Sequence, residues 1–258
     1  MTKTILITGA TDGIGALTAK NLAALGHTIL LHGRSADKLE KISSEIGGNT
    51  ESYLADMSDL TATKTMADQI SEKHDHLDIL INNAGVLKLP NPITPSGIDA
   101  RFVVNTLAPY VLTKALLPIM PSDGRVVNLS SAAQEGVNVD AMKDGRALSD
   151  MSAYAQSKLA ITIWTMGMAA TLPNGPLFFA VNPGSLLASK MVKEGFGVAG
   201  NDLSIGANIL ERAALDPDFA NHNGAYFDND SGAFSAPHPA GLDAAHRAEV
   251  MAAIEALV

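Results

Sequence analysis

Short apolar runs alternate with longer amphipathic stretches along the whole of this 258-residue chain. The runs are almost continuously apolar, which is typical of strands buried on both faces of a parallel sheet. The strand-like runs are Thr4–Thr8, Thr28–His32, Glu51–Leu54, Leu77–Ile81, Arg125–Ser130, Leu177–Val181 and, more weakly, Ala225–Phe227. The helix-like stretches are Ile14–Leu25, Ala36–Ile46, Ala62–His74, Asp99–Ile119, Ser152–Leu172, Asn201–Leu215 and Leu242–Ala256. This alternation predicts an α/β fold, a doubly wound parallel sheet with helices on both faces.

No repeat, low-complexity segment or Ser/Gly linker divides the chain, so we expect a single domain over residues 1–258. Two stretches lack a clear period, Ala132–Met151 and Leu186–Gly200. Long loops in compact domains are often functional, and a mobile surface loop is the alternative for each stretch.

Charge and cysteine content exclude several classes of function. The net charge is −9 and no basic run occurs, which argues against nucleic acid or an anionic membrane as a partner. The absence of cysteine excludes disulfides, thiolate zinc sites and cysteine nucleophiles, and fits a reducing compartment. We see neither a signal peptide nor a membrane span, and therefore expect a cytoplasmic protein.

The first strand runs into a glycine-rich turn, TGATDGIG at residues 8–15, which opens the first helix. Glycines let the backbone turn sharply and approach a pyrophosphate, and the helix N-terminus offers it unpaired N–H groups. The turn therefore predicts a dinucleotide site, although a plain glycine turn is the alternative. The residues expected to contact the cofactor here are Gly9, Thr11, Asp12, Gly13, Ile14 and Gly15.

The second strand ends at Arg34, at the position where an NAD-binding protein usually has a carboxylate for the ribose 2′-hydroxyl. A guanidinium can bind a 2′-phosphate, so we predict NADP(H) as the cofactor, with a solvated arginine as the alternative. After the third strand, Asp56 and Met57 could contact the adenine, although Asp56 could also be an ordinary turn aspartate.

Tyr154 and Lys158 lie four residues apart on one predicted helix, and therefore on the same face. A phenol is a poor acid or base at neutral pH unless its pKa is lowered, and a nearby ammonium would lower it. The pair predicts a tyrosine that works as a general acid and base. His74 and His76 flank an aspartate but have no further matched ligand, so we expect a solvated patch and no metal site.

Taken together, these motifs resemble the short-chain dehydrogenase/reductase family in its branch of about 250 residues, whose domain is a Rossmann fold. The resemblance covers essentially the whole chain. Each motif is weak alone, but together they occur in the family's order. They are the glycine-rich turn, Asn82-Asn83-Ala84-Gly85, Asn105, Ser130-Ser131, Tyr154-x-x-x-Lys158 and Asn182-Pro183-Gly184. The stretch Gly224-Ala225-Tyr226-Phe227 and the helix after it resemble the retinol-dehydrogenase-like branch.

The resemblance implies four catalytic residues. Tyr154 would exchange the proton with the substrate oxygen, and Lys158 would hold the nicotinamide ribose and tune Tyr154. Ser131 would hydrogen-bond the reacting oxygen, because the second serine of such a pair usually has this role in the family. Asn105 would support a water relay behind Lys158, although it could simply satisfy backbone groups.

The resemblance also implies further cofactor contacts. Asn83, Ala84 and Gly85 would lie against the adenosine ribose and the sheet, and Pro183 and Gly184 beside the nicotinamide. Ser189 stands where the family often has a threonine, and would bond the nicotinamide phosphate or carboxamide.

The predicted function is an NADP(H)-dependent oxidoreductase that interconverts an alcohol and a carbonyl compound, which is a ketone or an aldehyde. A non-enzymatic NADP-sensing or scaffold protein on the same fold is the alternative. A lyase or epimerase that uses the same cofactor usually has a separate substrate domain. The sequence shows no such domain, which argues against this class. The resemblance also implies a homo-oligomer, either a dimer or a tetramer.

Residues 186–200 follow Pro183 and Gly184 directly, so we expect a lid on the substrate side of the site. Its apolar residues suggest a lipophilic small-molecule substrate, against which Lys190 and Lys193 argue. These apolar residues are Leu186, Leu187, Ala188, Met191 and Val192. The alternative is a rigid, helix-containing connection that only packs on the core.

Overall fold

The protein is described here by a computed structural model, which covers residues 2–145 and 148–258. The described chain forms one eight-stranded sheet with the strand order β3-β2-β1-β4-β5-β6-β7-β8. The strands are β1 (Thr4–Ile7), β2 (Thr28–Gly33), β3 (Thr50–Leu54), β4 (Ile79–Asn82), β5 (Arg125–Leu129), β6 (Leu177–Asn182), β7 (Tyr226–Asp228) and β8 (Ala233–Ser235). All neighbouring pairs are parallel except β7 and β8. The predicted doubly wound α/β fold is therefore confirmed.

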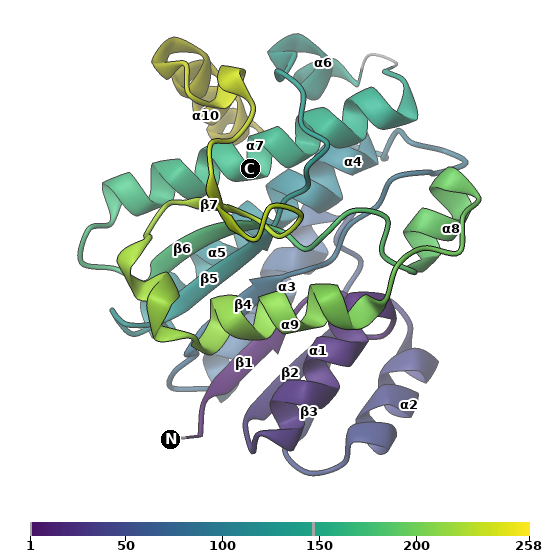
Figure 1. The fold of residues 1–258 in the computed structure, drawn as a ribbon, viewed down its shortest axis with the longest axis vertical. Helices are drawn as coiled ribbons and strands as arrows, with labels where there is room; N and C mark the ends of the chain where they lie inside the picture. Colours follow the sequence, from purple (N-terminus) through teal and green to yellow (C-terminus); the bar gives the residue numbers. More distant parts are fainter. Residues whose placement is uncertain (1, 146–147) are drawn as a thin grey trace.

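Helices cover both faces of this sheet. Figure 1 shows α1, α2 and α9 along one side, and α7 on the other, where α3, α5 and α10 also pack. The helices are α1 (Gly13–Ala24), α2 (Ala36–Ile46), α3 (Leu60–Lys73), α4 (Ala100–Phe102), α5 (Ala108–Leu116), α6 (Val139–Asp144), α7 (Asp150–Thr171), α8 (Lys190–Phe196), α9 (Leu203–Leu215) and α10 (Ala244–Leu257). A π-helical turn, Val103–Leu107, joins α4 to α5, and 3₁₀ turns occur at Leu117–Ile119, Pro217–Asn221 and Pro239–Gly241.

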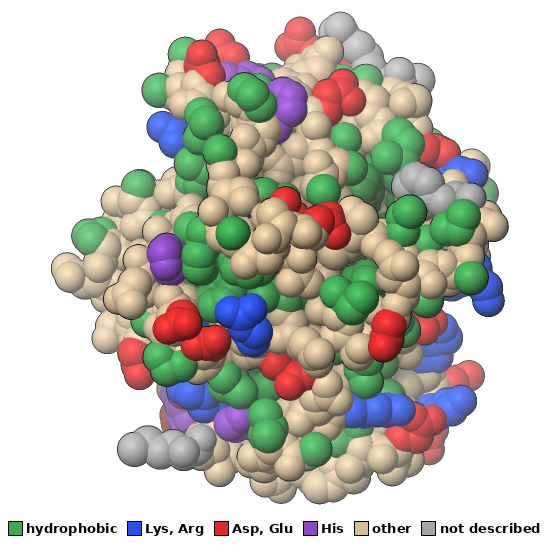
Figure 2. Space-filling view, in the orientation of Figure 1, with side chains coloured by type: hydrophobic (Ala, Val, Ile, Leu, Met, Phe, Trp, Pro, Cys, Tyr) green, Lys and Arg blue, Asp and Glu red, His purple; other side chains and the backbone are tan. Residues whose placement is uncertain are grey.

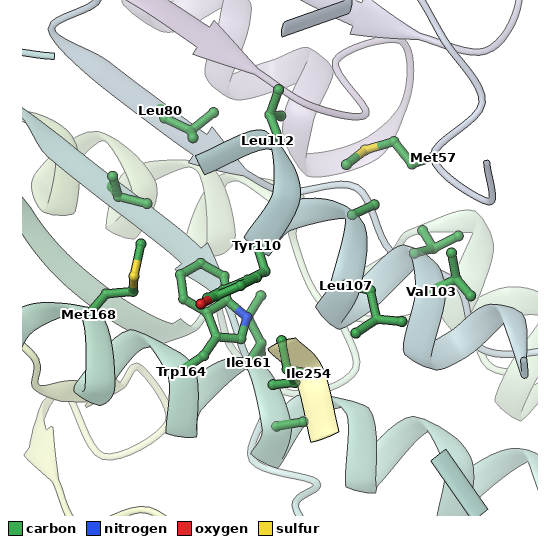
Figure 3. Packing of buried hydrophobic residues seen from close by; sticks show 14 of the residues in the cluster. Met57, Leu80, Val103, Leu107, Tyr110, Leu112, Ile161, Trp164, Met168 and Ile254 are labelled. Atoms are coloured by element: carbon green, nitrogen blue, oxygen red, sulfur yellow. The ribbon is translucent and has the colours of Figure 1, made fainter. Parts of the chain in front are cut away.

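The apolar runs are continuous because successive strand residues feed two separate cores. On β1, Leu6 packs into the core under α3, α5 and α7, whereas Ile5 and Ile7 pack into the core under α1 and α9. The first core is centred on Trp164 of α7, whose ring lies edge-on to Tyr110 of α5 with 5.6 Å between centroids (Figure 3). Both cores thus hold the sheet rigidly between helices.

Three short elements differ from the sequence-based expectation. β8 is antiparallel and only three residues long, so it lacks the crossover helix that made the other strands recognisable. Helix α8 lies inside the stretch predicted to be irregular, between an N-cap at Ser189 and a left-handed Gly197 at its end. Helix α6 does the same within the other stretch, Ala132–Met151, of which residues 146–147 lie outside the described residues.

The order of the strands determines where a ligand can bind. β1 has β2 on one side and β4 on the other, so the loops that leave β1 and β4 run to opposite faces. In doubly wound sheets the crevice at such a switch point, outside the carboxyl ends of the strands, is the usual ligand site. The predicted glycine-rich turn follows β1, and Asn83 follows β4.

One continuous helical run, Ala100–Ile119, is long and apolar enough to cross a membrane by length and composition alone. Two thirds of its apolar window, 67%, is buried inside the fold, as for a core helix of a globular domain. The expectation of no membrane span stays a prediction. On the face drawn in Figure 2 the basic side chains are scattered and do not form a patch.

Candidate active site

The glycine-rich turn after β1 has close backbone contacts that explain its composition. Gly9 has a φ of +64°, and a Cβ added there would lie 3.0 Å from the Ala84 Cα. A side chain at Gly15 would collide with the Gly9 carbonyl and the Asn83 amide. Glycine at both positions therefore lets the turn lie flat against the loop that follows β4.

Side-chain hydrogen bonds connect the loop after β4 to this turn. The Asn83 amide donates to the carbonyl oxygens of Thr8 and Gly9, at 2.8 and 3.1 Å. The Ala84 N–H donates to the Thr8 hydroxyl at 3.0 Å. Asn83 and Ala84, which were predicted to contact the cofactor, thus hold the shape of the turn.

Asp12 begins helix α1, because its carboxylate accepts from the Gly13 N–H at 2.8 Å. Ser189, the N-cap of α8, stands on the other side of Gly13, where an added Cβ would lie 3.8 Å from its Cβ. Ser189 therefore lies next to the α1 N-terminus. The N–H groups at that N-terminus are the kind of donors that bind a pyrophosphate.

The end of β2 carries a free positive charge. Arg34 is exposed and makes no hydrogen bond or ion pair with any residue in the described part of the chain. Lys38, which sequence reasoning missed, lies one helical turn further on and pairs with Asp12 at 3.3 Å. Two cations beside a helix N-terminus fit the phosphates of a dinucleotide, and the residues present therefore suit the predicted cofactor.

The segment after β3 is less clearly suited to a ligand. Asp56 is exposed, and one of its oxygens accepts from the Ser58 N–H and hydroxyl at 2.9 and 2.8 Å. The side chain of Met57 is buried in the core under α3 and α5. The alternative of a turn aspartate describes the bonds seen, and only the backbone of Met57 can meet a cofactor.

Tyr154, Ser131 and Lys158 lie close together. The Ser131 side chain lies beside the Tyr154 phenol, and the Lys158 ammonium lies 5.6 Å from the centroid of the Tyr154 ring. Lys158 donates to the Leu129 carbonyl at 2.7 Å. Ser130 is buried and binds the Lys158 carbonyl at 3.1 Å, so its hydroxyl belongs to the interior.

Burial controls the ionisation of this pair. It raises the pKa of the Tyr154 phenol, against which the hydrogen bond with Ser131 acts. Burial also lowers the pKa of Lys158 to about 8. The predicted lowering of the Tyr154 pKa by Lys158 is wrong for this structure, because desolvation of the phenolate outweighs the other effects. Tyr154 is therefore a protonated phenol at neutral pH.

Asn105 lies in the π-helical turn between α4 and α5. Its side chain accepts from the Val86 N–H at 2.8 Å and donates to the Val86 carbonyl at 3.0 Å. It also donates to the Ser157 hydroxyl at 2.9 Å, one residue before Lys158. The backbone-satisfying alternative describes these bonds, and they tie the loop after β4 to helix α7. π-Bulges frequently mark functional sites.

Two supporting residues escaped sequence reasoning. The Tyr226 hydroxyl donates to the Ser131 carbonyl at 3.1 Å and fixes the backbone that carries the Ser131 hydroxyl. Arg101 is buried and bonds both Asp99 and Asp150, which joins the start of α4 to the start of α7. Neither pair has a sequence signal, because the partners are 95 and 49 residues apart.

The turn after β6 is held by the β7–β8 connection. Asn229 donates to the Pro183 carbonyl at 2.9 Å, and Asp230 accepts from the Ser185 N–H at 2.8 Å. Gly184 has a φ of +118°, which favours glycine. The predicted nicotinamide side of the site is thus braced from a neighbouring strand.

The segment predicted to be a lid closes on itself and packs over the site. Leu187 pairs with Asn201 and is buried against Gly184 and Gly206, so it does not line a pocket. Met191 of α8 lies over Gly85, where an added Cβ would be 3.7 Å from its Cε and 3.6 Å from the Lys158 Nζ.

His74 and a hollow on the surface both lie away from Tyr154. His74 contacts the Tyr53 hydroxyl at 2.9 Å and Glu51 at 3.2 Å, and no three His, Asp or Glu side chains could hold a metal ion within residues 2–145 and 148–258. A surface hollow of about 400 Å³ lies between α2 and β3, at the β3 edge of the sheet and away from Tyr154.

Comparisons with known proteins point to one family. The model of the short chain dehydrogenase family matches residues 3–196. Human retinol dehydrogenase 13 is 35% identical over 193 residues, which are 70% of this chain and 58% of that protein. Human polyprenol dehydrogenase is 35% identical over 173 residues, 62% of this chain and 52% of that protein. This chain thus spans just over half the length of these two relatives.

Solved structures give the same picture. A protein from Mycobacterium Paratuberculosis is 29% identical with a TM-score of 0.82, covering 99% of this chain and 92% of that one. A metagenomic short-chain oxidoreductase in complex with NADP is 30% identical with a TM-score of 0.65, covering 84% and 92% of the two chains.

Proposed function

The chain belongs to the short-chain dehydrogenase family, and from this premise we propose that it is an NADP(H)-dependent oxidoreductase that interconverts a ketone or aldehyde and its alcohol. The general dehydrogenase reaction follows from the family. The observation that carries the finer proposal is the contact between the Tyr154 phenol and the Ser131 hydroxyl, with Lys158 beside them.

Arg34 supports the preference for NADP(H). Arg34 directly follows β2, and its guanidinium has no partner among the described residues. Lys38, one helical turn further on, pairs with Asp12 at the α1 N-terminus. A 2′-phosphate would satisfy the Arg34 guanidinium, whereas a bare 2′-hydroxyl would leave it solvated. Some solved relatives, including the metagenomic oxidoreductase, contain NADP.

When bound, the nicotinamide supplies the hydride that reduces a carbonyl carbon. Tyr154 then completes the alcohol by giving its phenolic proton to the substrate oxygen, which Ser131 polarises by a hydrogen bond. The raised pKa of Tyr154 keeps that proton in place at neutral pH. Lys158, with its pKa of about 8, carries a positive charge that stabilises the phenolate left behind.

A lipophilic substrate is the class we favour. Relatives at 35% identity are a retinol and a polyprenol dehydrogenase, both named for apolar alcohols. In this chain Met191 of α8 and the exposed Leu186 stand at the substrate side of the predicted site. Leu187 and Val192 are buried in the fold, so Leu186, Ala188 and Met191 are the apolar side chains of this segment that could meet a substrate.

The test is oxidation of NADPH with a panel of apolar aldehydes and ketones, for the wild type and Tyr154→Phe. We expect turnover by the wild type, and a loss of about 10²–10⁴-fold in kcat for Tyr154→Phe with cofactor binding retained. Tyr53→Phe, a variant at the far edge of the sheet, is the matched control and should keep full turnover. Cofactor binding without any turnover would instead favour an NADP-sensing protein.

A further inference from the structure

His32 is a polar residue inside an otherwise apolar strand. It lies near the end of β2 and is only 3% exposed. One ring nitrogen, Nδ1, accepts from the Gly9 N–H at 3.2 Å. The other, Nε2, lies 3.1 Å from the Ala55 carbonyl oxygen. The imidazole therefore spans the glycine-rich turn after β1 and the turn after β3.

The two contacts fix the state of the ring. A backbone N–H can only donate, so Nδ1 must present a lone pair to Gly9, and the ring proton must be on Nε2. From there it donates to the Ala55 carbonyl. Burial lowers the pKa of His32 to about 4. The hydrogen bond with the Ala55 carbonyl and the nearby Asp56 carboxylate act in the opposite direction but are outweighed. The ring is neutral at physiological pH.

Both partners of the ring belong to the predicted cofactor site. Gly9 is the first glycine of the turn, and its carbonyl is already held by Asn83 at 3.1 Å. His32 holds the N–H of the same residue, so the Gly9 backbone is gripped from both sides. Ala55 precedes Asp56, which was predicted to meet the adenine. An apolar residue at position 32 would leave the Gly9 N–H without this acceptor.

We propose that His32 is a positioning residue that holds the glycine-rich turn in the geometry that binds the dinucleotide, while its bond to the Ala55 carbonyl keeps the ring proton on Nε2. The inference rests on the proposed function for the identity of the ligand. It adds a residue that touches neither the substrate nor the reacting atoms, and acts only through the backbone of Gly9 and Ala55.

Two substitutions separate the two ring nitrogens. His32→Asn places an oxygen where Nδ1 lies, so it keeps an acceptor for the Gly9 N–H and loses the bond to Ala55. His32→Gln places an amide near Nε2, so it keeps the bond to Ala55 and loses the acceptor for Gly9. His27→Gln is the matched control, because the Nδ1 of His27 accepts from the Lys3 N–H at 3.1 Å at the opposite end of β2.

The measurements are NADPH binding by calorimetry, thermal unfolding, and ¹⁵N NMR of the imidazole in the free protein. We expect the wild-type His32 ring to carry its proton on Nε2 alone. We expect His32→Asn and His27→Gln to bind NADPH within about threefold of the wild type, and His32→Gln to bind about tenfold more weakly or worse, the cost of an unsatisfied donor. A role in packing alone would weaken both His32 variants equally.

Equal Kd values for His32→Asn and His32→Gln, or a proton on Nδ1 in the wild type, would overturn the inference. If His32→Gln does not fold, the wild-type spectrum and the Kd of His32→Asn decide. Wild-type protein that binds neither NADPH nor NADH would refute the proposed function, which is a different outcome from binding that is indifferent to position 32.

Discussion

Gly33 offers a direct test of how tightly the cofactor turn is packed. A Cβ at this position would lie 2.5 Å from the Thr11 Cγ2 and 3.3 Å from the Leu39 Cδ2. Carbon atoms in contact normally lie about 3.5–4.0 Å apart, so Gly33→Ala must displace either Thr11 or the end of β2 by about 1 Å. Overpacking of this kind costs about 1–3 kcal/mol.

We expect Gly33→Ala to lower the free energy of unfolding by about that amount, and to weaken NADPH binding because Thr11 belongs to the turn. Thr11→Ser removes the colliding methyl group, so the double variant should recover at least about 1 kcal/mol of the loss in urea unfolding. Gly167→Ala in α7 is the control, because its Cβ would lie 3.5 Å from the Met251 sulfur in ordinary contact. Wild-type stability in Gly33→Ala, or no recovery with Thr11→Ser, would refute the reasoning.

Three further predictions concern charge, pH and motion. Arg34→Asp should shift the kcat/KM preference from NADPH toward NADH by about tenfold or more, since a charge-assisted contact is worth about 1.5–3 kcal/mol, and an unchanged ratio would remove Arg34 from the site. Because the pKa of His32 in the folded protein is about 4, below its ordinary 6.5, its neutral form stabilises the fold above pH 6.5, and roughly 3 kcal/mol is lost as the pH falls to about 4. Urea unfolding of wild type and His32→Asn should show a steeper loss in the wild type, and parallel curves would contradict this. If residues 186–200 are a lid, their amide exchange should slow when NADPH binds, whereas equal protection in the free and bound protein would make them a fixed wall.

Periodicity and local chemistry predicted most of the fold. Helix α2 was predicted at Ala36–Ile46 and is found there, because Ser35 caps its start and Gly47 ends it within the same short stretch of sequence. The glycine-rich turn and the pairing of Tyr154 with Lys158 are likewise local patterns. The short strand β8 was missed because three residues carry no usable period. The predicted cytoplasmic location and homo-oligomer stay predictions.

The supporting bonds of the site could not be predicted in the same way. His32 reaches Gly9 across 23 residues, and Tyr226 reaches Ser131 across 95. Each bond depends on the order of strands in the sheet, which decides what lies beside each strand end. His32 did leave a trace in the sequence, since a histidine within an apolar strand needs partners for both nitrogens. Its partners became identifiable only from the fold.

The ionisation of Tyr154 depends on the fold and not on local sequence spacing alone. Helical spacing places Lys158 on the same face, and from this alone one expects a lowered pKa for the phenol. In the folded protein the Lys158 ammonium is drawn to the Leu129 carbonyl at the end of β5, and burial raises the pKa of the phenol. A phenol that keeps its proton can donate it, so in the proposed reaction the free protein is ready for reduction of a carbonyl. Oxidation of an alcohol must first remove that proton, and should therefore become relatively faster as the pH rises.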